Sequence, residues 1–465
     1  MNKIAVNIAL NLGYNIISLV APLLTLPYLA RVLGAGGIGI YAYGYNIVAF
    51  FVIFVMLGIN NYGVREISKN KGNSKKISSI FIELSIIQIT LTVVISFLYL
   101  IYCYAGNRSV IDFYFVLFII AAGFDINWFF VGIENFKTGL VRQLFVKVLL
   151  ICLIFCFIKS ESDIIIYIII NGVCVLTGNL LFFIIAIQNI HRTELRLLTL
   201  NKHIKPLFIL FIPVIVVSIY KISDKILLGM YCSYSEVGLY DYAEKLFSIP
   251  GMIITAISAV LLPRAVNILK NNNNNNNFVN YSFGLMLTLC VGMTFGMAIL
   301  SENVVYLLFG EEFSKSATIF VILAPAIIFQ GIGSIIRAEI LLPNNLDGRY
   351  IASVSIAAVF NVIANCILIP KFGSYGAAVS LLLSEISATV AQVMFTLDYL
   401  NIILIFKVFI INMIAGVVMF FLIDIINACG NIEGLTGLIV DVFTGSVIYV
   451  LINFILYYFI FSYRK

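Results

Sequence analysis

Three charged residues, Lys221, Asp224 and Lys225, interrupt an apolar stretch near residues 207–230. Their i, i+3, i+4 spacing puts them on one face of a helix, where Lys221 can pair with Asp224 and Lys225 remains as an extra positive charge. A charge in apolar surroundings is unfavourable unless it meets a partner, water or a ligand. The extra cation suits an anionic ligand. The alternatives are a neutral cluster that only orients helices, or lysines that extend towards water.

Asp125, Arg337 and Glu385 also fall inside apolar stretches, where no loop accounts for them. If they line a cavity, Arg337 suits a phosphate group, and Asp125 or Glu385 suits an exchanged proton or sodium ion, or sugar hydroxyls. The alternative for each of the three is a salt bridge between helices. Glu83 lies near the end of its stretch, so we expect it at an interface with water.

Apolar helices solvated by lipid must position these charges. The hydrophobic fraction of the 465 residues is 62% and the charged fraction 11%, whereas soluble domains are about half apolar and about a quarter charged. The mean hydropathy is +1.09. A helix needs roughly 20 apolar residues to cross a bilayer. Hydropathy predicts fourteen such spans, near residues 8–30, 38–62, 80–104, 111–133, 142–158, 163–188, 207–230, 246–266, 279–300, 318–342, 350–370, 374–398, 403–426 and 436–461.

The spans divide into two lobes of six, followed by two further helices. We expect an N-terminal lobe at 1–190, a cytoplasmic linker at 191–206, a C-terminal lobe at 207–398 and the two additional helices at 399–465. Gly-Ile-Tyr-Ala-Tyr around Tyr41 resembles Gly-Leu-Tyr-Asp-Tyr around Tyr240, and Arg65 corresponds to Arg264 at the same offset of 199 residues. This repeat indicates duplication. The seven asparagines at 271–277 predict a flexible connection.

The distribution of basic residues predicts the orientation. With both termini on the cytoplasmic side, nineteen of the 28 Lys and Arg residues lie on that side, six on the other and three within spans. The first apolar stretch lacks a small-residue cleavage site, so we expect a retained first helix. Basic residues occur in short runs between spans, which argues against a nucleic-acid partner.

Motifs for catalysis are absent from the sequence. It contains no phosphate-binding GxxxxGK[ST] loop, no HExxH and no GxSxG, and its eight cysteines form no CxxC pair. We therefore expect no enzyme, no metal site and no cofactor. Transport would be coupled to an ion gradient or driven by the gradient of the substrate.

Five blocks of sequence resemble the O-antigen and capsule repeat-unit flippases of the multidrug/oligosaccharidyl-lipid/polysaccharide exporter superfamily. They are LTLPYLARVLGAGGIGIYAY (24–43), NNYGVREISK (60–69), NWFFVGIENFK (127–137), YAEKLFSIPGMIITAISAVLLPRAV (242–266) and FGSYGAAVSLLLSEI (372–386). They reach from the first span through the twelfth. The resemblance implies an all-α membrane protein with two six-helix lobes, related by a pseudo-twofold repeat, around a central cavity.

The resemblance further implies that the protein moves an undecaprenyl-pyrophosphate-linked oligosaccharide from the inner to the outer leaflet of a bacterial cytoplasmic membrane by alternating access. On the matching positions, Arg31, Arg65, Glu134 and Arg264 carry over as motif residues, with a role in gate and loop geometry. Protons or sodium ions are candidate coupling partners. A polysaccharide polymerase and a chain-length regulator of O-antigen and lipopolysaccharide biosynthesis are candidate protein partners.

Two other functions remain open from the sequence. A multidrug/cation antiporter shares this architecture, but its cavity is expected to carry carboxylates and few cations, whereas three basic residues lie within the spans here. A membrane-embedded polysaccharide polymerase would need a sizeable outer loop, and the longest predicted outer connection, 301–317, is short.

Overall fold

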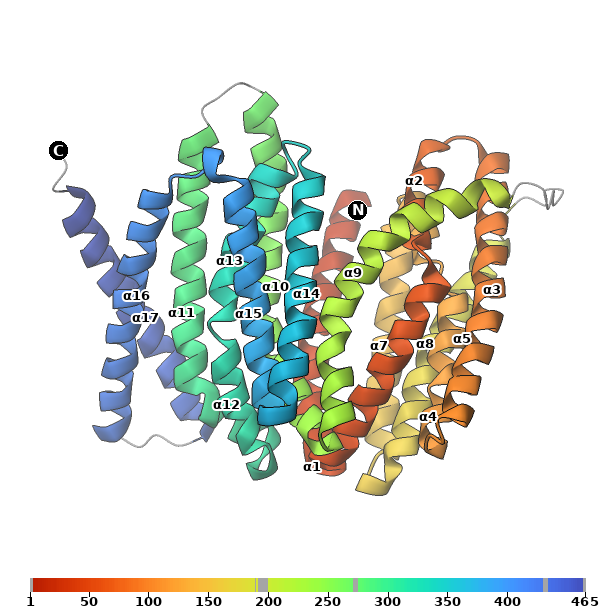
Figure 1. Ribbon diagram of the computed structural model, residues 1–465, viewed down its shortest axis with the longest axis horizontal. Coiled ribbons are helices and arrows are strands. Elements are labelled where there is room, and N and C mark those ends of the chain that lie inside the picture. Colours follow the sequence, from red (N-terminus) through yellow and green to blue (C-terminus); the bar gives the residue numbers. More distant parts are fainter. Residues whose placement is uncertain (1–2, 189, 191–199, 271–274, 430–433, 463–465) are drawn as a thin grey trace. The chain divides into compact units, whose positions relative to one another are not determined.

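The computed structural model describes residues 3–188, 190, 200–270, 275–429 and 434–462, and every regular element in these ranges is helical (Figure 1). The all-α class predicted from the sequence is confirmed. The chain forms two compact units, Met1–Ile226 and Leu227–Lys465, which are described separately.

The described part of the first unit contains eight α-helices, a short 3-10 helix and most of a ninth α-helix, α9, which continues into the second unit. The helices are α1 (Lys3–Met56), α2 (Ile59–Lys69), α3 (Ser74–Ala105), α4 (Val110–Tyr114), α5 (Val116–Gly123), α6 (Asn127–Gly132), α7 (Phe136–Phe157), the short η1 (Glu161–Asp163), α8 (Ile164–Gln188) and α9 (Asn201–Tyr231). Because α9 begins at Asn201, helix occupies the last residues of the predicted linker. Residues 191–199 of that linker lie outside the described residues.

Helix α1 is two helical arms joined at Gly34. This residue has φ 64° and ψ 176°, which a side chain would strain and glycine tolerates. Figure 1 shows the red ribbon of α1 descending from the N label, turning near the α1 label and rising towards α2. The predicted span 8–30 lies in this element before Gly34, and the predicted span 38–62 begins after Gly34 and runs on into α2.

The second unit contains α10 to α17. Its elements are α10 (Tyr234–Lys270), α11 (Asn275–Phe309), η3 (Glu311–Phe313), α12 (Ser314–Leu323), α13 (Ala326–Ile335), the π-helix η4 (Ile336–Leu341), α14 (Asp347–Phe372), α15 (Ser374–Phe395), η5 (Leu397–Tyr399), α16 (Ile402–Cys429) and α17 (Gly434–Ser462). The predicted flexible connection 271–277 is wrong for its last three asparagines, which begin α11. Residues 271–274 lie outside the described residues.

The last two helices, α16 and α17, pack against α11. The Tyr449 hydroxyl of α17 donates a hydrogen bond to the Thr288 carbonyl of α11 (2.9 Å). On α16, Gly416 lies so close to the Phe295 ring of α11 that an added Cβ would come within 2.2 Å of it. Close contacts with α11 therefore hold α16 and α17 within the second unit.

Twelve described helices are long and apolar enough to cross a membrane, and the number is thirteen if the bent pair Glu311–Leu323 and Ala326–Leu341, at 42°, forms one span. The segment Ala21–Lys69 counts once among the twelve although it spans 49 residues and contains the break at Gly34. Multiple membrane crossings are confirmed, and the number fourteen stays a prediction.

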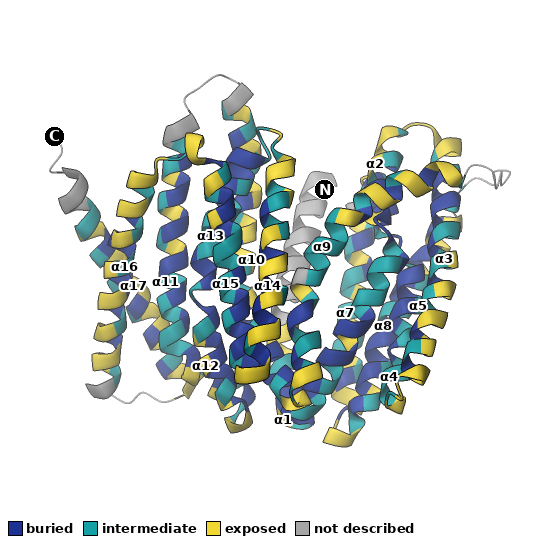
Figure 2. Ribbon diagram, viewed as in Figure 1, coloured by how far each residue is buried: buried dark blue, intermediate teal, exposed yellow. Residues whose placement is uncertain are grey.

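Large apolar side chains cover the outer faces of the helices. Figure 2 shows exposed positions along α3, α16 and α17. Among them are Phe97, 64% exposed, on α3, and Phe443 and Phe454, 70% and 71% exposed, on α17. A surface of this kind is stable against lipid, where apolar side chains meet a solvent of similar polarity.

The core of the first unit is built around the contact of α2 with α6. Ile67 and Tyr62 of α2 are buried with Trp128 and Phe129 of α6 in one apolar cluster that also includes Phe81 of α3. This close approach requires glycine at position 63, because an added Cβ would lie 2.4 Å from Cε3 of the Trp128 ring.

We predict that Gly63→Ala destabilises the protein by about 1–3 kcal/mol, because Trp128 cannot move without disturbing the cluster around it. The measurement is the unfolding temperature of the detergent-solubilised protein. Gly284→Ala on α11 is the matched control, since an added Cβ there meets no atom within 4 Å. Equal unfolding temperatures for both variants would contradict the packing described here.

Candidate functional site

The charged cluster predicted on the seventh span lies on α9 at the end of the first unit. The structure leaves Lys221 exposed, Lys225 partly buried and Asp224 almost fully buried, at 2% exposure. Asp224 and Lys225 both have interaction partners in the structure. The helix places the three residues on one face, as their spacing predicts.

An aromatic group on α1 accompanies this cluster. The Lys225 ammonium is close enough to the Tyr45 phenol to interact with it electrostatically. Tyr45 is 42% exposed, stacks on Tyr41 with ring centroids 5.8 Å apart, and meets the Phe118 ring edge-on at 5.3 Å. A lysine beside one exposed aromatic ring, here Tyr45, can bind a ligand that combines negative charge with an apolar face. The spacing of charges gave no signal for Tyr45, which lies two residues beyond the repeat around Tyr41.

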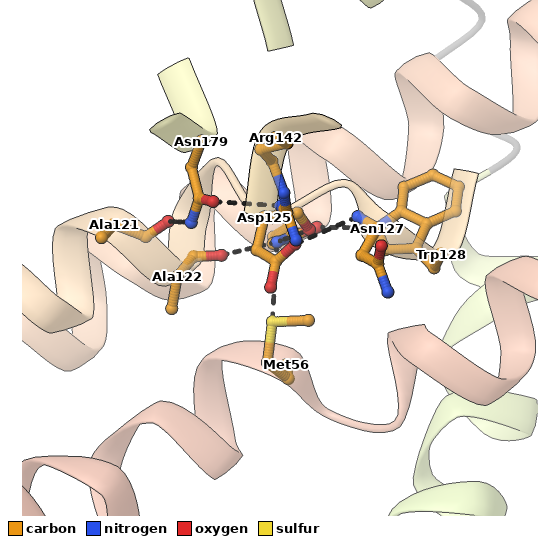
Figure 3. Close-up of polar contacts among 9 residues, drawn as sticks. Met56, Ala121, Ala122, Asp125, Asn127, Trp128, Arg142 and Asn179 are labelled. Atoms are coloured by element: carbon orange, nitrogen blue, oxygen red, sulfur yellow. Dashed lines mark hydrogen bonds and ion pairs between the residues drawn. The ribbon is translucent and has the colours of Figure 1, made fainter. Parts of the chain in front are cut away.

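Asp125 lies in the break between α5 and α6, where three residues interrupt the helix. The Arg142 guanidinium of α7 donates a hydrogen bond to its carboxylate (Nη1 to Oδ1, 2.8 Å) and a second one to Asn179 Oδ1 of α8 (3.0 Å). Figure 3 shows the three side chains converging on this point. Asp125 therefore forms the interhelical salt bridge that the sequence left open as an alternative.

Two amides complete this cluster by binding backbone carbonyls at the helix break. Gln88 Nε2 of α3 donates to the carbonyls of Ala122 (2.7 Å) and Asp125 (3.0 Å). Asn179 Nδ2 donates to the Ala121 carbonyl (2.8 Å) (Figure 3). Such groups must be satisfied inside a membrane protein. The presence of Gln88 and Asn179 inside apolar spans is the sequence signal that could have identified them.

Glu83 is not at an interface with water, contrary to the expectation from its position. It is 5% exposed. Its carboxylate accepts a hydrogen bond from His203 Nε2 (2.7 Å) and forms an ion pair with Lys202 (2.9 Å). Tyr62 completes the chain of contacts, with its hydroxyl 2.8 Å from His203 Nδ1. When His203 is neutral, Nε2–H donates to Glu83 and Nδ1 accepts from Tyr62. The group fastens the start of α9 to α2 and α3.

Arg337 and Glu385 belong to the second unit. Arg337 is partly buried in η4, with its guanidinium carbon 5.8 Å from the centre of the Tyr350 ring of α14. Glu385 on α15 is partly buried and accepts a hydrogen bond from Gln330 Nε2 of α13 (3.0 Å). The structure thus gives each of them a neighbour on another helix.

The four motif residues are exposed and lie at or near helix ends or bends. Arg31 precedes the break of α1, and Arg65 on α2 lies over the Tyr62 ring at 5.6 Å. Glu134 follows α6 with φ 59° and pairs with Lys71 at 2.5 Å. On α10, Arg264 lies over an aromatic ring at 5.3 Å. Exposed pairs contribute little stability, so the positions suit loop geometry better than core stability.

Comparison with known proteins decides the family. A family model described as "Polysaccharide biosynthesis protein" matches residues 4–269, more than half of the chain. The chain belongs to this family. The description of the family agrees with the prediction from the sequence that this protein acts in polysaccharide biosynthesis.

Named relatives of this polysaccharide biosynthesis protein are transporters. A protein named as an O-antigen transporter in Escherichia coli (strain K12) is 24% identical over 80% of this chain and 92% of its own length. A protein named as a low-salt glycan biosynthesis flippase in Haloferax volcanii is 27% identical over 39% of each chain. These two proteins are similar in sequence to this chain.

Solved structures show the same fold. The lipid II flippase MurJ in an inward closed conformation has a TM-score of 0.75 at 18% identity, covering 97% of this chain and 100% of that one. An inward-facing multidrug transporter of the MATE family has a TM-score of 0.62 at 11% identity, covering 82% and 94%. At these identities the likeness concerns the fold alone.

We predict that Arg142→Leu lowers the free energy of unfolding by about 2–3 kcal/mol, because it leaves Asp125 and Asn179 without their donor. This is less than the usual cost for a buried pair, since the Asp125 side chain is 33% exposed. The measurement is a double-mutant cycle on the unfolding of the purified protein.

The double variant Asp125→Leu/Arg142→Leu should recover part of that loss, because no charge then remains unpaired. Strictly additive effects of the two single variants would show that the ion pair contributes no coupling energy.

Proposed function

We propose that this protein is a flippase that moves an undecaprenyl-pyrophosphate-linked oligosaccharide repeat unit, of the O-antigen or capsule type, from the inner to the outer leaflet of a bacterial cytoplasmic membrane. The similarity to the E. coli protein named as an O-antigen transporter, over 92% of that protein's length, carries the proposal. The MurJ-like fold of the whole chain supports it, because it offers the same arrangement of helices. Both termini are proposed to be cytoplasmic.

The cluster on α9 is the proposed contact with the pyrophosphate. The cluster of Lys221, Asp224 and Lys225 carries one net positive charge. A net positive charge suits the pyrophosphate, which carries two or three negative charges. Tyr45 beside Lys225 offers an aromatic face to an adjoining sugar ring. In the second unit, Arg337 is the proposed additional phosphate contact.

Movement between the leaflets is proposed to follow alternating access of the two units. Arg31, Arg65, Glu134 and Arg264 are then the residues that set the loops and gates at helix ends. Asp125 and Glu385 are the carboxylates from the sequence that could exchange a proton or a sodium ion, and the Asp125–Arg142 pair would have to open for such an exchange. A polymerase and a chain-length regulator are the proposed partners downstream.

The MATE-like fold supports a second candidate, a multidrug/cation antiporter. It is the weaker one on this chain's residues, because α9 carries Lys221 and Lys225, the latter near Tyr45, and a cationic surface disfavours a cationic drug.

We predict that this protein restores surface polysaccharide in a strain that lacks its repeat-unit flippase, and that Lys225→Ala lowers the amount by about tenfold, the effect of losing one charge-assisted contact. Lys221→Ala should act in the same direction. The measurement is surface polysaccharide per cell at equal membrane abundance of each variant.

Lys407→Ala is the matched control, since Lys407 is an exposed lysine on the outer helix α16. Full activity of Lys225→Ala would show that the α9 cluster does not bind the substrate. Drug resistance without polysaccharide from any repeat unit tested would favour the antiporter.

A further inference from the structure

One carboxyl group in the second unit is fully buried without a hydrogen-bond partner. Glu339 in η4 has 0% exposure, and neither of its carboxylate oxygens accepts a hydrogen bond from a described residue. The hydroxyl of Ser282, on α11, is buried beside it, but no hydrogen bond of ordinary geometry joins the two groups. Glu339 lies two residues after Arg337 in the same predicted span, but it was not among the charged residues that the sequence pointed to.

The charged side chains at this end of the surrounding helices are directed to other groups. Helices α10, α13 and α14 pack against η4. Arg264 of α10 and Arg337 of η4 each lie over an aromatic ring, Arg349 of α14 donates to a backbone carbonyl, and Asp347 of α14 is exposed. Helix α13 carries no charged residue. An ionised Glu339 would therefore have no counter-charge among these groups.

A carboxylate in such surroundings is strongly disfavoured relative to the neutral acid. The neutral acid carries no charge and has a single O–H donor. The Ser282 oxygen lies beside it and can accept a hydrogen bond from that O–H group after a rotation of the side chain. The conformation seen here therefore favours a Glu339 that has taken up a proton.

The backbone around Glu339 is unusual in a way that connects it to other polar groups. In η4 the amide of Leu342 donates to the carbonyl of Arg337, five residues earlier (3.0 Å), which is the π-helical pattern. Short π-helical segments are frequent at functional sites in helices. Glu339 lies inside this π-helical segment, beside Ser282 of α11.

Two polar pairs lie on the helix that leads into η4. The Ser334 hydroxyl is hydrogen-bonded to the Ser258 hydroxyl of α10 (2.6 Å), and Gln330 donates to Glu385 of α15 (3.0 Å). Helix α13 and η4 thus carry Gln330, Ser334 and Glu339 in succession, and no hydrogen bond among the described residues joins Glu339 to either pair. An apolar helix packed only for stability has no need of three such polar side chains.

We propose that Glu339 is a proton-binding site of the second unit, which takes up a proton in the conformation seen here and releases it when η4 rearranges. In the uptake step one O–H bond forms on a carboxylate oxygen and the proton comes from water; release reverses the step. Uptake and release of protons by Glu339 would make the transport cycle dependent on the proton gradient, and that part rests on the proposed flippase function.

The direct test is infrared difference spectroscopy of the purified, full-length protein in lipid. We expect a carbonyl band of a protonated carboxylic acid at neutral pH that is lost in Glu339→Gln. The band should persist, shifted, in Glu339→Asp, and unchanged in Glu302→Gln, which replaces an exposed carboxylate of α11. A band that survives in Glu339→Gln would overturn the proposal. The proposal would also be overturned if the band of the wild-type protein were lost on addition of sodium and did not respond to pH.

A transport measurement separates the site from the proposed function. In cells whose polysaccharide is restored by the wild-type protein, Glu339→Gln should abolish the dependence of polysaccharide export on the proton gradient, with normal abundance and size-exclusion profile. Unchanged dependence would exclude coupling through Glu339. If the wild type restores no polysaccharide, the flippase function fails while the infrared result still decides whether Glu339 binds a proton.

Discussion

Charge inside an apolar helix bundle must be compensated, and this constraint accounts for most of the polar structure of the protein. Asp125 is compensated by Arg142, and Glu83 by His203 and Lys202. Each compensation links helices that are distant in sequence. The same contacts that lower the cost of the charge therefore also fix how α3, α7, α8 and α9 pack. Glu339 lacks such compensation, which is why it stands apart from the others.

The polar groups gather where the backbone departs from a regular α-helix. Asp125 lies in the break between α5 and α6, and backbone carbonyls at the break accept hydrogen bonds from Gln88 and Asn179. Glu339 lies in the π-helix η4. A break exposes backbone groups that need polar partners, so polar side chains are retained beside it. Such positions are also the ones at which a helix can change shape at low cost.

Much of the fold could be predicted from hydropathy, because a helix that faces lipid appears in the sequence as a continuous stretch of apolar residues. Every predicted span falls on helical elements of the structure. Helices α9 and α11 begin inside the predicted linker and asparagine tract, at Asn201 and Asn275. The break at Gly34 was not predicted, since it depends on a single φ value. The family was recognisable from short blocks near helix ends, and the family model confirmed it.

The partners of the charges could not be predicted in the same way. Arg142 is the first residue of the predicted span 142–158, and it reaches Asp125 because α7 packs beside the α5–α6 break. Glu83 was expected at an interface with water, but in the structure His203 of α9 covers it. Both outcomes depend on which helices become neighbours, and the spacing of residues within one helix carries no information about that. The role of Lys221, Lys225 and Arg337 in substrate binding likewise stays a prediction.

The central claim is that the protein transfers a lipid-linked oligosaccharide across a bilayer, and the most direct measurement is transfer in reconstituted vesicles. The purified protein would be placed in liposomes with a fluorescent pyrophosphate-linked oligosaccharide lipid in both leaflets. The fraction accessible to an external sugar-modifying enzyme would then be followed. We predict accessibility of nearly all of the lipid with the protein, and of the outer leaflet alone in protein-free liposomes. Equal accessibility in the two preparations, with correctly folded protein and its native repeat unit, would contradict the account.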